Sequence, residues 1–432
     1  MLVSTRAEAK PFAYVTNFFS NNVSVIDTAT NTVVATVPVG TNPNGVAISP
    51  YGTHAYVTNG ASNTVSVILT ATNTVVTTVP VGSGPFGVAV TPDGTYAYIT
   101  NGASNNVSVI ATATNTVVAT VPVGSTPRGV AITPYGNQVF VVNNLSNNVS
   151  VIDTATNTVV ATVAVGFAPF GMAITPDGTR AYVADGSSNA ISVIDTATST
   201  VVATVSVGSD PRGVAITPDG SRAYVTNVLS DTVSVIDTAT NAVVATVPGL
   251  GLFNSAVAIT TDGIHAYVTS SDSNTTAVID TTTNTLVATV PVGNFPSGVA
   301  ITPNKVRYAC PLSQGFWETH PNSWPVTSLT LGSQTYTQAE LLALLATPPS
   351  YNADASLILA SQLIAAKLNI AKGSDPAQVI GVIVDADNLL SQFTGKLPYN
   401  VGTYSVVGRQ MVNDANVLNR FNSCGFTTDC RQ

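Results

Sequence analysis

Few side chains of the kinds that perform acid–base chemistry occur in the long N-terminal part of this chain. Residues 11–304 contain no Lys and no Glu, and their only histidines are His54 and His265. General acid–base catalysis needs a positioned His, carboxylate, Lys, Tyr or Cys. Both histidines lie two residues after a turn glycine, at a repeat position that elsewhere holds Tyr96, Gln138, Arg180 and Arg222. Because this position accepts so many residue types, we expect it to be a solvated site beside a turn.

Aspartates recur at two turn positions of the same repeat. One position, in the phrase Val-Ile-Asp-Thr, holds Asp27, Asp153, Asp195, Asp237 and Asp280. The other, in the phrase Pro-Asp-Gly and its variants, holds Asp93, Asp177, Asp219 and Asp262. Asp side chains accept hydrogen bonds from the backbone amides of turns. We therefore predict structural rather than catalytic roles for both sets.

No metal or organic cofactor is expected, and calcium is the alternative for the repeat region. Calcium takes several oxygen ligands from carboxylates and carbonyls. Four further aspartates stand outside the two recurring turn positions, at Asp185, Asp210, Asp231 and Asp272. They belong to different repeat units, so they could bind calcium only if the fold made them converge.

All three cysteines, Cys310, Cys424 and Cys430, lie beyond the repeats. A Cys310–Cys424 disulfide would clasp the C-terminal segment, with a loop-closure stabilisation of about 4 kcal/mol. Cys424–Cys430 is the competing pair, and spacing alone does not choose between them. A zinc site built from the cysteines and His320 is a further alternative, although this spacing matches no standard zinc pattern.

A repeated phrase, Ala-Tyr-Val-Thr-Asn, sets the architecture that must position these residues. Its aromatic residue falls at Tyr14, Tyr56, Tyr98, Phe140, Tyr182, Tyr224 and Tyr267. Each unit contains four short runs rich in Val, Ile and Thr, separated by Gly, Pro, Asn and Asp, which is typical of strands and turns. A period of about 42 residues with four strands per unit is the signature of a propeller blade.

The repeat count also predicts how the ring closes. The inner phrase Gly-Val-Ala-Ile has no copy before Tyr14, and its last copy, at residues 298–303, has no second run after it. We therefore predict that residues 298–303 supply the inner strand of the first blade. The predicted fold is an all-β seven-bladed propeller of four-stranded antiparallel blades spanning residues 11–305, plus a smaller, mainly α C-terminal domain.

The phrases Tyr14-Val-Thr-Asn17, Val149-Ser-Val-Ile-Asp-Thr154 and Gly213-Val-Ala-Ile-Thr-Pro-Asp-Gly220 resemble the YVTN family of β-propeller repeats. That family is found in secreted and surface-layer proteins of archaea and bacteria. The resemblance extends over the whole repeat region and implies the fold. It implies no particular activity, because propellers host many unrelated functions.

The composition changes after the repeats, and residues 306–432 are expected to form a separate module. Its opening phrase, Cys310-Pro-Leu-Ser-Gln-Gly-Phe-Trp-Glu-Thr-His-Pro321, resembles the start of a C-terminal module of secreted bacterial proteins. Thr337-Gln-Ala-Glu340 predicts a capping box that begins a helix. Further helices are predicted over residues 354–372, 376–394 and 405–421. Residues 1–10 are expected to be an N-terminal tail.

The composition excludes some classes of function. The net charge is −8 and no basic stripe is present, so nucleic-acid binding is not expected. No run is long and apolar enough to span a bilayer, and residues 1–10 lack the apolar core of a leader peptide. Only 8% of residues are charged, so the propeller surface must consist mainly of Thr, Ser and Asn. This coat favours an extracellular or cell-surface location, with any leader outside this chain.

The two rims of the predicted ring differ in sequence. One rim carries the monotonous turns, whereas the other carries variable loops and the links between blades. Exposed aromatic and Arg side chains gathered on one face are typical of a recognition surface. The links supply the candidate binding residues Phe86, Arg128, Phe170, Arg212, Phe253 and Phe295. The alternative is that these loops have drifted and merely plug the channel.

The favoured function is therefore that of a secreted or cell-surface interaction protein that binds a protein or glycan through the variable rim. Two other functions are considered. Seven-bladed propellers of similar appearance include lactonases and streptogramin-type lyases, which use His, Glu or metal ligands at the channel mouth. A structural surface-coat subunit that assembles laterally is the third alternative.

Overall fold

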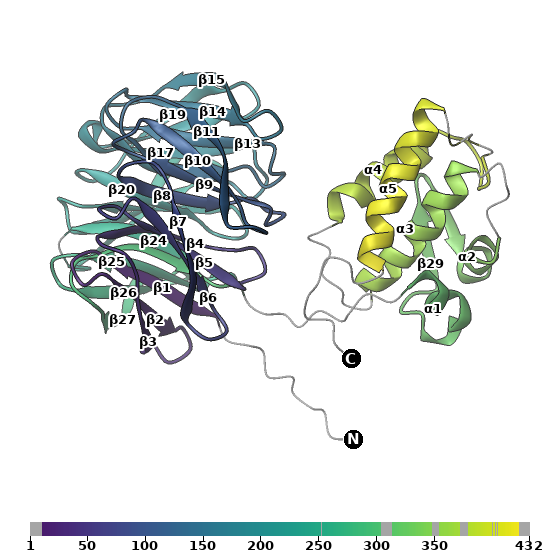
Figure 1. Ribbon diagram of the computed structural model, residues 1–432, viewed down its shortest axis with the longest axis horizontal. Coiled ribbons are helices and arrows are strands. Elements are labelled where there is room, and N and C mark those ends of the chain that lie inside the picture. Colours follow the sequence, from purple (N-terminus) through teal and green to yellow (C-terminus); the bar gives the residue numbers. More distant parts are fainter. Residues whose placement is uncertain are drawn as a thin grey trace. The chain divides into compact units, whose positions relative to one another are not determined.

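The structure is a computed structural model that describes residues 11–251, 253–303, 313–347, 354–371, 379–399, 401, 403 and 405–422. The chain divides into two compact units, residues 1–306 and 307–432 (Figure 1). The predicted boundary lay between residues 305 and 306. The three cysteines lie outside the described residues, so both disulfide pairings and the zinc alternative stay predictions.

The first unit is a ring of seven four-stranded antiparallel sheets, here called blades 1 to 7 (Figure 1). Blade 1 has the order β28-β1-β2-β3 and contains β28 (Pro296–Ile301), β1 (Phe12–Asn17), β2 (Asn22–Asp27) and β3 (Thr32–Pro38). Blade 2 contains β4 (Pro43–Ile48), β5 (His54–Asn59), β6 (Thr64–Leu69) and β7 (Thr74–Pro80). Blade 3 contains β8 (Pro85–Val90), β9 (Tyr96–Asn101), β10 (Asn106–Ala111) and β11 (Thr116–Pro122).

The remaining blades repeat this pattern. Blade 4 contains β12 (Pro127–Ile132), β13 (Gln138–Asn143), β14 (Asn148–Asp153) and β15 (Thr158–Ala164). Blade 5 contains β16 (Pro169–Ile174), β17 (Arg180–Asp185), β18 (Ala190–Asp195) and β19 (Thr200–Ser206), with a 3-10 turn η1 (Gly186–Ser188). Blade 6 contains β20 (Pro211–Ile216), β21 (Arg222–Asn227), β22 (Thr232–Asp237) and β23 (Ala242–Pro248). Blade 7 contains β24 (Asn254–Ile259), β25 (His265–Ser270), β26 (Thr275–Asp280) and β27 (Thr285–Pro291).

The last strand of the repeat array closes the ring, as the repeat count predicts. Strand β28 pairs antiparallel with β1, with Ala13 opposite Ile301 and Val15 opposite Val299. The backbone amide of Thr302 donates to the Phe12 carbonyl at 2.8 Å and continues this pairing. Closure leaves no open edge between the first and last blades. The seven-bladed fold predicted from the sequence is confirmed.

Neighbouring blades are joined by the repeated tyrosine. The hydroxyl of Tyr98 in blade 3 donates to Asn157 Oδ1 of blade 4 at 2.9 Å, and Tyr182 bonds Asn241 of blade 6 in the same way at 2.8 Å. These tyrosines are buried within the apolar clusters between blades. The repeated aromatic is therefore a packing residue, as expected.

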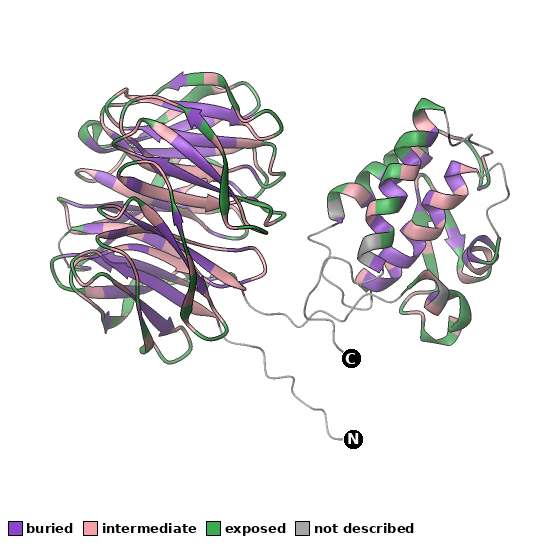
Figure 2. Cartoon of the chain, viewed as in Figure 1, coloured by how far each residue is buried: buried purple, intermediate pink, exposed green. Residues whose placement is uncertain are grey.

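The inner strands approach each other too closely for a side chain at the repeated glycine. A Cβ on Gly87 would lie 2.4 Å from the Arg128 carbonyl oxygen of the next blade. Glycine is required there because the backbones meet around the axis. Burial varies across each blade (Figure 2). In blade 1, for example, the two middle strands β1 and β2 are largely buried, whereas the outermost strand β3 is largely exposed.

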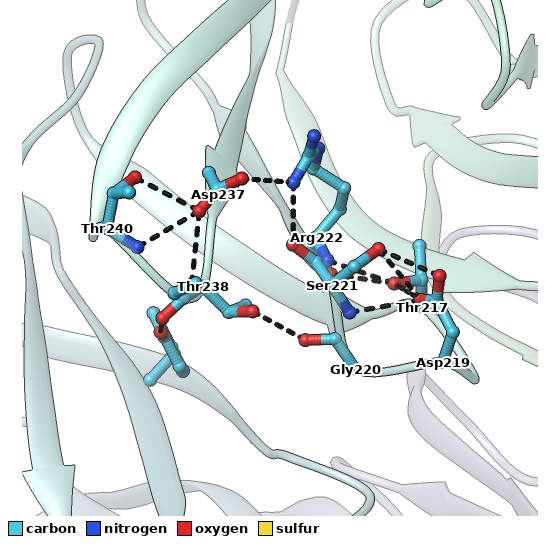
Figure 3. A network of polar contacts seen from close by, with 10 residues as sticks. Thr217, Asp219, Gly220, Ser221, Arg222, Asp237, Thr238 and Thr240 are labelled. Carbon is cyan, nitrogen blue, oxygen red and sulfur yellow. Dashed lines mark hydrogen bonds and ion pairs between the residues drawn. The ribbon is translucent and has the colours of Figure 1, made fainter.

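The recurring aspartates organise turns. Figure 3 shows two turns of blade 6. Asp219 accepts from the Ser221 amide at 3.0 Å. Asp237 accepts from the Thr240 amide at 2.9 Å and forms an ion pair with Arg222. The Thr240 amide and hydroxyl, followed by the Arg222 charge, hold the pKa of Asp237 below its usual value. The predicted turn role of these carboxylates is confirmed.

The second unit is mainly helical. It contains α1 (Gln314–Thr319), η2 (Pro321–Ser323), α2 (Gln338–Leu345), α3 (Ala355–Ala371), α4 (Ile380–Ser391) and α5 (Val406–Asn422), and the hairpin β29 (Ser328–Leu331) with β30 (Gln334–Thr337). The predicted capping box is present, because Thr337 and Glu340 bond each other's backbone amides. Trp317 is fully buried and donates through Nε1 to Asn369 at 3.1 Å.

The structure of this unit differs from the sequence-based expectation in two respects. The hairpin β29–β30 was not predicted from the sequence. The helix predicted over residues 376–394 spans Ile380–Ser391, and residues 376–378 lie outside the described part. It ends early because Gln392 and Phe393 donate to carbonyls three residues back, which tightens the chain into a turn before Gly395 at φ 86°. A 3-10 turn of this kind is a common helix end.

Candidate ligand pocket at the channel mouth

A cavity of about 530 Å³ lies on the axis of the ring, enclosed by residues from all seven inner strands. All six candidate binding residues line it: Phe86, Arg128, Phe170, Arg212, Phe253 and Phe295. The structure therefore brings together side chains that are up to about 210 residues apart in sequence, as expected for a closed toroid. Their role in binding stays a prediction.

In blades 2 to 6 a bulge at the start of the inner strand carries the side chain that follows the proline. In blade 4, Pro127 pairs with Asn143 and Val130 pairs with Val141, so Arg128 and Gly129 fall outside the ladder. Pro127 itself is buried and fixes the start of the strand. A bulge of this kind re-aims a side chain at a sheet edge. The same irregularity occurs in blades 2, 3, 5, 6 and 7.

The four residues at this position in blades 3 to 6 form a continuous stack of aromatic rings and guanidinium groups. The Arg128 guanidinium carbon lies 4.5 Å from the centre of the Phe86 ring and 5.7 Å from that of Phe170. Arg212 lies 4.9 Å from the Phe170 ring. The two rings also meet edge to face, with centroids 5.3 Å apart. Cation–π contacts within 6 Å are attractive, so this stack holds the pocket wall in place.

The two arginines of the stack differ in their charge balance. Arg212 forms an ion pair with Asp210 at 2.9 Å. Among the described residues Arg128 has no acidic partner, and its buried Nε makes no hydrogen bond. Burial, with a smaller contribution from the Arg212 charge, lowers the pKa of the Arg128 guanidinium. The charge of Arg128 is thus balanced by no acidic side chain in the described part of the protein.

Phe253 and Phe295 reach the pocket from a different repeat position, one residue before the proline position. Both have positive φ angles, 59° and 57°, a conformation that is uncommon for bulky residues. Phe295 packs against Phe18 and Phe19, with ring centroids 6.0 and 5.1 Å apart. Phe19 is largely exposed, so this corner extends the apolar lining onto the rim.

The remaining lining was not singled out in the sequence. Inner-strand side chains form an apolar floor: Val46, Val88, Val130, Met172, Val214, Val257 and Val299. Asn44, Phe18, Ala256 and three serines also line the cavity, and the serine hydroxyls donate within the protein. Ser271 bonds the Pro296 carbonyl at 2.7 Å, and Ser255 bonds the Ser297 carbonyl at 3.1 Å. The alternation of Val in the inner phrase is the signal that could have identified this floor.

The aspartates considered for calcium do not converge. Asp210 is engaged with Arg212, and Asp272 is exposed. Asp185 is fully buried and accepts from the Ser192 hydroxyl at 2.6 Å; burial raises its pKa to about 6. Within the described ranges, no three His, Cys, Asp or Glu residues gather as a metal site would require.

No helix in the described part of the chain is long and apolar enough to cross a bilayer.

The histidines lie at the strand starts beside the turns of the other rim. His54 is half-buried, its Nδ1 lies 3.1 Å from the Thr53 hydroxyl, and burial lowers its pKa. His265 faces Asp280 across the strand pair. In two other blades the same position holds Arg180 and Arg222, which pair with the facing aspartates. Neither histidine lines the channel pocket.

Comparison with known proteins finds that parts of the first unit are similar to two families of propellers. Residues 27–162 match the family described as "Lactonase, 7-bladed beta-propeller". Residues 132–221 match "YNCE-like beta-propeller". No curated protein matches the sequence.

Solved structures resemble the propeller in fold. A functionally unknown protein from Desulfotomaculum acetoxidans is 22% identical, with a TM-score of 0.62 over 68% of this chain and 99% of that one. A candidate 6-phosphogluconolactonase from Bacteroides uniformis is 18% identical, with a TM-score of 0.59 over 68% and 100%. Hydrazine synthase from Kuenenia stuttgartiensis is 24% identical, with a TM-score of 0.55 over 62% and 98%. At these identities the likeness concerns the fold alone.

Proposed function

We propose that the protein is a secreted or cell-surface interaction protein whose propeller binds a protein or glycan partner through the variable rim. One observation supports this most strongly: all six candidate residues line a single cavity at the channel mouth. Phenylalanine and arginine are residues that concentrate binding energy when they surround a desolvated pocket. Random sequence change in the loops would not be expected to produce a continuous stack of alternating aromatic and guanidinium groups.

Between the two partner classes, the lining favours a protein. Sugars are held mainly by hydrogen bonds to their hydroxyls, and the pocket offers few free groups of this kind because Ser255 and Ser271 already donate internally. Its floor and collar are valine and phenylalanine. An apolar side chain of a protein partner matches such a lining, since burial of apolar surface drives association.

A lactonase-type enzyme is the alternative suggested by the family match over residues 27–162. Lactone hydrolysis by acid–base chemistry needs a His, carboxylate or metal-bound water near the substrate. Among the described residues that line the cavity there is no His, Asp or Glu. The geometry therefore supports binding better than hydrolysis.

A surface-coat subunit is a second candidate because the outer strands expose a belt of apolar side chains. Each outer strand presents one half-exposed valine: Val34, Val76, Val118, Val160, Val202, Val244 and Val287. Outer strands also leave one backbone edge unpaired, which other chains can use. Ordered sheets or filaments in electron micrographs at rising protein concentration would favour this function.

The test of the binding proposal compares two double variants of the full chain. Phe86→Ala with Arg212→Ala removes part of the pocket stack. Tyr135→Ala with Arg222→Ala likewise removes one aromatic residue and one arginine, from turns and strand starts of the other rim, where Tyr135 is largely exposed. Labelled protein is applied to glycan arrays and to intact cells. Loss of binding in the first variant alone supports the proposal, and equal binding by both variants refutes it.

A further inference from the structure

We infer that the pocket selects a carboxylate attached to an apolar body, with the Arg128 guanidinium as its counter-ion. This inference rests on the proposed function, because it specifies which part of a protein partner enters the cavity. It follows from two properties of the lining taken together, its unbalanced charge and its apolar surface.

The charge of the pocket calls for an anion. Arg128 lines the cavity, has no acidic partner among the described residues, and keeps a buried Nε without a hydrogen bond. A buried donor without a partner is costly and is expected to be paired in the functional state. Since Asp210 already balances Arg212, Arg128 is the unbalanced one of the two arginines that line the described cavity.

The form of the cation favours a carboxylate. A guanidinium group presents parallel N–H donors that match the two oxygens of a carboxylate, and such pairs are stronger than neutral hydrogen bonds. Arg128 lies over the Phe86 ring at 4.5 Å, so the plane of its side chain is constrained before any ligand arrives. Constraint of this kind lowers the ordering cost of binding.

The rest of the lining favours an apolar body next to the carboxylate. Phe86 and Phe170 flank the guanidinium, and the floor below is made of valines and Met172. A hydrophilic anion such as a sugar acid would leave its hydroxyls without partners there, which is unfavourable. A protein chain that ends in an apolar residue, or carries an acidic residue beside one, has the required chemistry.

The test uses three small probes with the full chain. N-acetyl-phenylalanine carries an aromatic body and a carboxylate, its amide lacks only the charge, and glucuronate carries the charge on a sugar. Dissociation constants are measured by ligand-observed NMR at low ionic strength. We expect the acid to bind at least about 10-fold more tightly than the amide, as charge-assisted bonds are stronger than neutral ones.

Three variants assign the selectivity to residues. In Arg128→Gln the preference for the acid over the amide should fall to nearly one. Arg180→Gln, at the other rim in blade 5 and paired with Asp195, is the matched control and should keep the preference. In Asp210→Asn, Arg212 loses its partner, so the affinity for the acid should rise by about 3-fold, the scale of a partly exposed ion pair.

Each outcome has a separate meaning. Equal binding of acid and amide overturns the carboxylate inference but leaves the pocket as a binding site. A preference that survives Arg128→Gln overturns the role of Arg128. If Arg128→Gln folds poorly, an unchanged affinity for the acid in Asp210→Asn overturns the attraction of the carboxylate by positive charge in the pocket. Tighter binding of glucuronate than of N-acetyl-phenylalanine overturns the apolar body and favours a glycan. The double-variant experiment on cells judges the proposed function separately.

Discussion

Replacing the buried Asp185 with asparagine should stabilise the propeller at neutral pH and not at acidic pH. Five other blades hold Asn at this position, and in each its Nδ2 donates to the two equivalent side chains; in blade 6, Asn227 donates to Thr232 and Ser234, both at 3.0 Å. In blade 5 the residue equivalent to Thr232 is Ala190, and the residue equivalent to Ser234 donates to Asp185 instead. The second oxygen of Asp185 accepts no hydrogen bond.

The magnitude follows from the pKa of Asp185. Burial raises it from 3.8 to about 6, and each unit corresponds to about 1.4 kcal/mol. Well below pH 3.8 the carboxyl is protonated in both folded and unfolded chains, so it costs nothing by this route. Between about pH 4 and pH 6 the unfolded chain ionises while the folded chain keeps its proton, and the folded state loses about 3 kcal/mol of stability in total. Asp185→Asn should therefore gain about 2.5 kcal/mol at pH 8 relative to its effect at pH 4, where a small part of the loss is already present.

The assay is urea denaturation followed by far-UV circular dichroism at pH values from 4 to 8. Both tryptophans, Trp317 and Trp324, lie in the second unit, so tryptophan fluorescence provides an internal control that the variant should not change. Asn227→Asp is the converse variant and should lose stability as the pH rises. A difference between Asp185→Asn and the unmodified protein that is the same at pH 4 and pH 8 would refute the reasoning.

Two further predictions concern the joints between blades. Tyr98→Phe removes the hydroxyl that donates to Asn157 and should lower the free energy of unfolding by about 1 kcal/mol. Tyr56→Phe should lower it by less, because the equivalent asparagine of the next blade, Asn115, accepts no hydrogen bond. Thermal melts of both variants compare the two effects directly. Gly87→Ala would put a Cβ 2.4 Å from the Arg128 carbonyl oxygen and should cost about 1–3 kcal/mol, measured by urea denaturation; an unchanged midpoint would contradict the close approach of the inner strands.

The repeat made most of the propeller predictable. The number of blades and the closing strand follow from counting phrases, because each copy of Ala-Tyr-Val-Thr-Asn needs one inner strand. A finer signal was also present in the sequence. The one unit with Phe140 in place of Tyr faces the one turn that holds Ser199 in place of Asn, so the hydroxyl and its acceptor are absent together.

The details of the pocket could not be predicted in the same way. Pattern placed Phe86, Arg128 and Phe170 at one repeat position, but their mutual contacts depend on a bulge that changes the register after the proline. Asp210 stands two residues before Arg212 in the sequence, but whether the two side chains pair depends on how the link between the blades folds. In the second unit, the hairpin over residues 328–337 has short strands of mixed polarity, and such strands carry little periodic signal.

The closing strand β28 determines when the propeller can complete its folding during synthesis. The first blade begins with Phe12, yet it gains its fourth strand only when Pro296–Ile301 has been made. Until then the edge of β1 stays open and can pair with any extended segment, including that of a sister chain. The ring can therefore close only after nearly the whole repeat region has been synthesised. A chain whose synthesis stalls within blade 7 leaves the edge of β1 unpaired and able to associate with other chains.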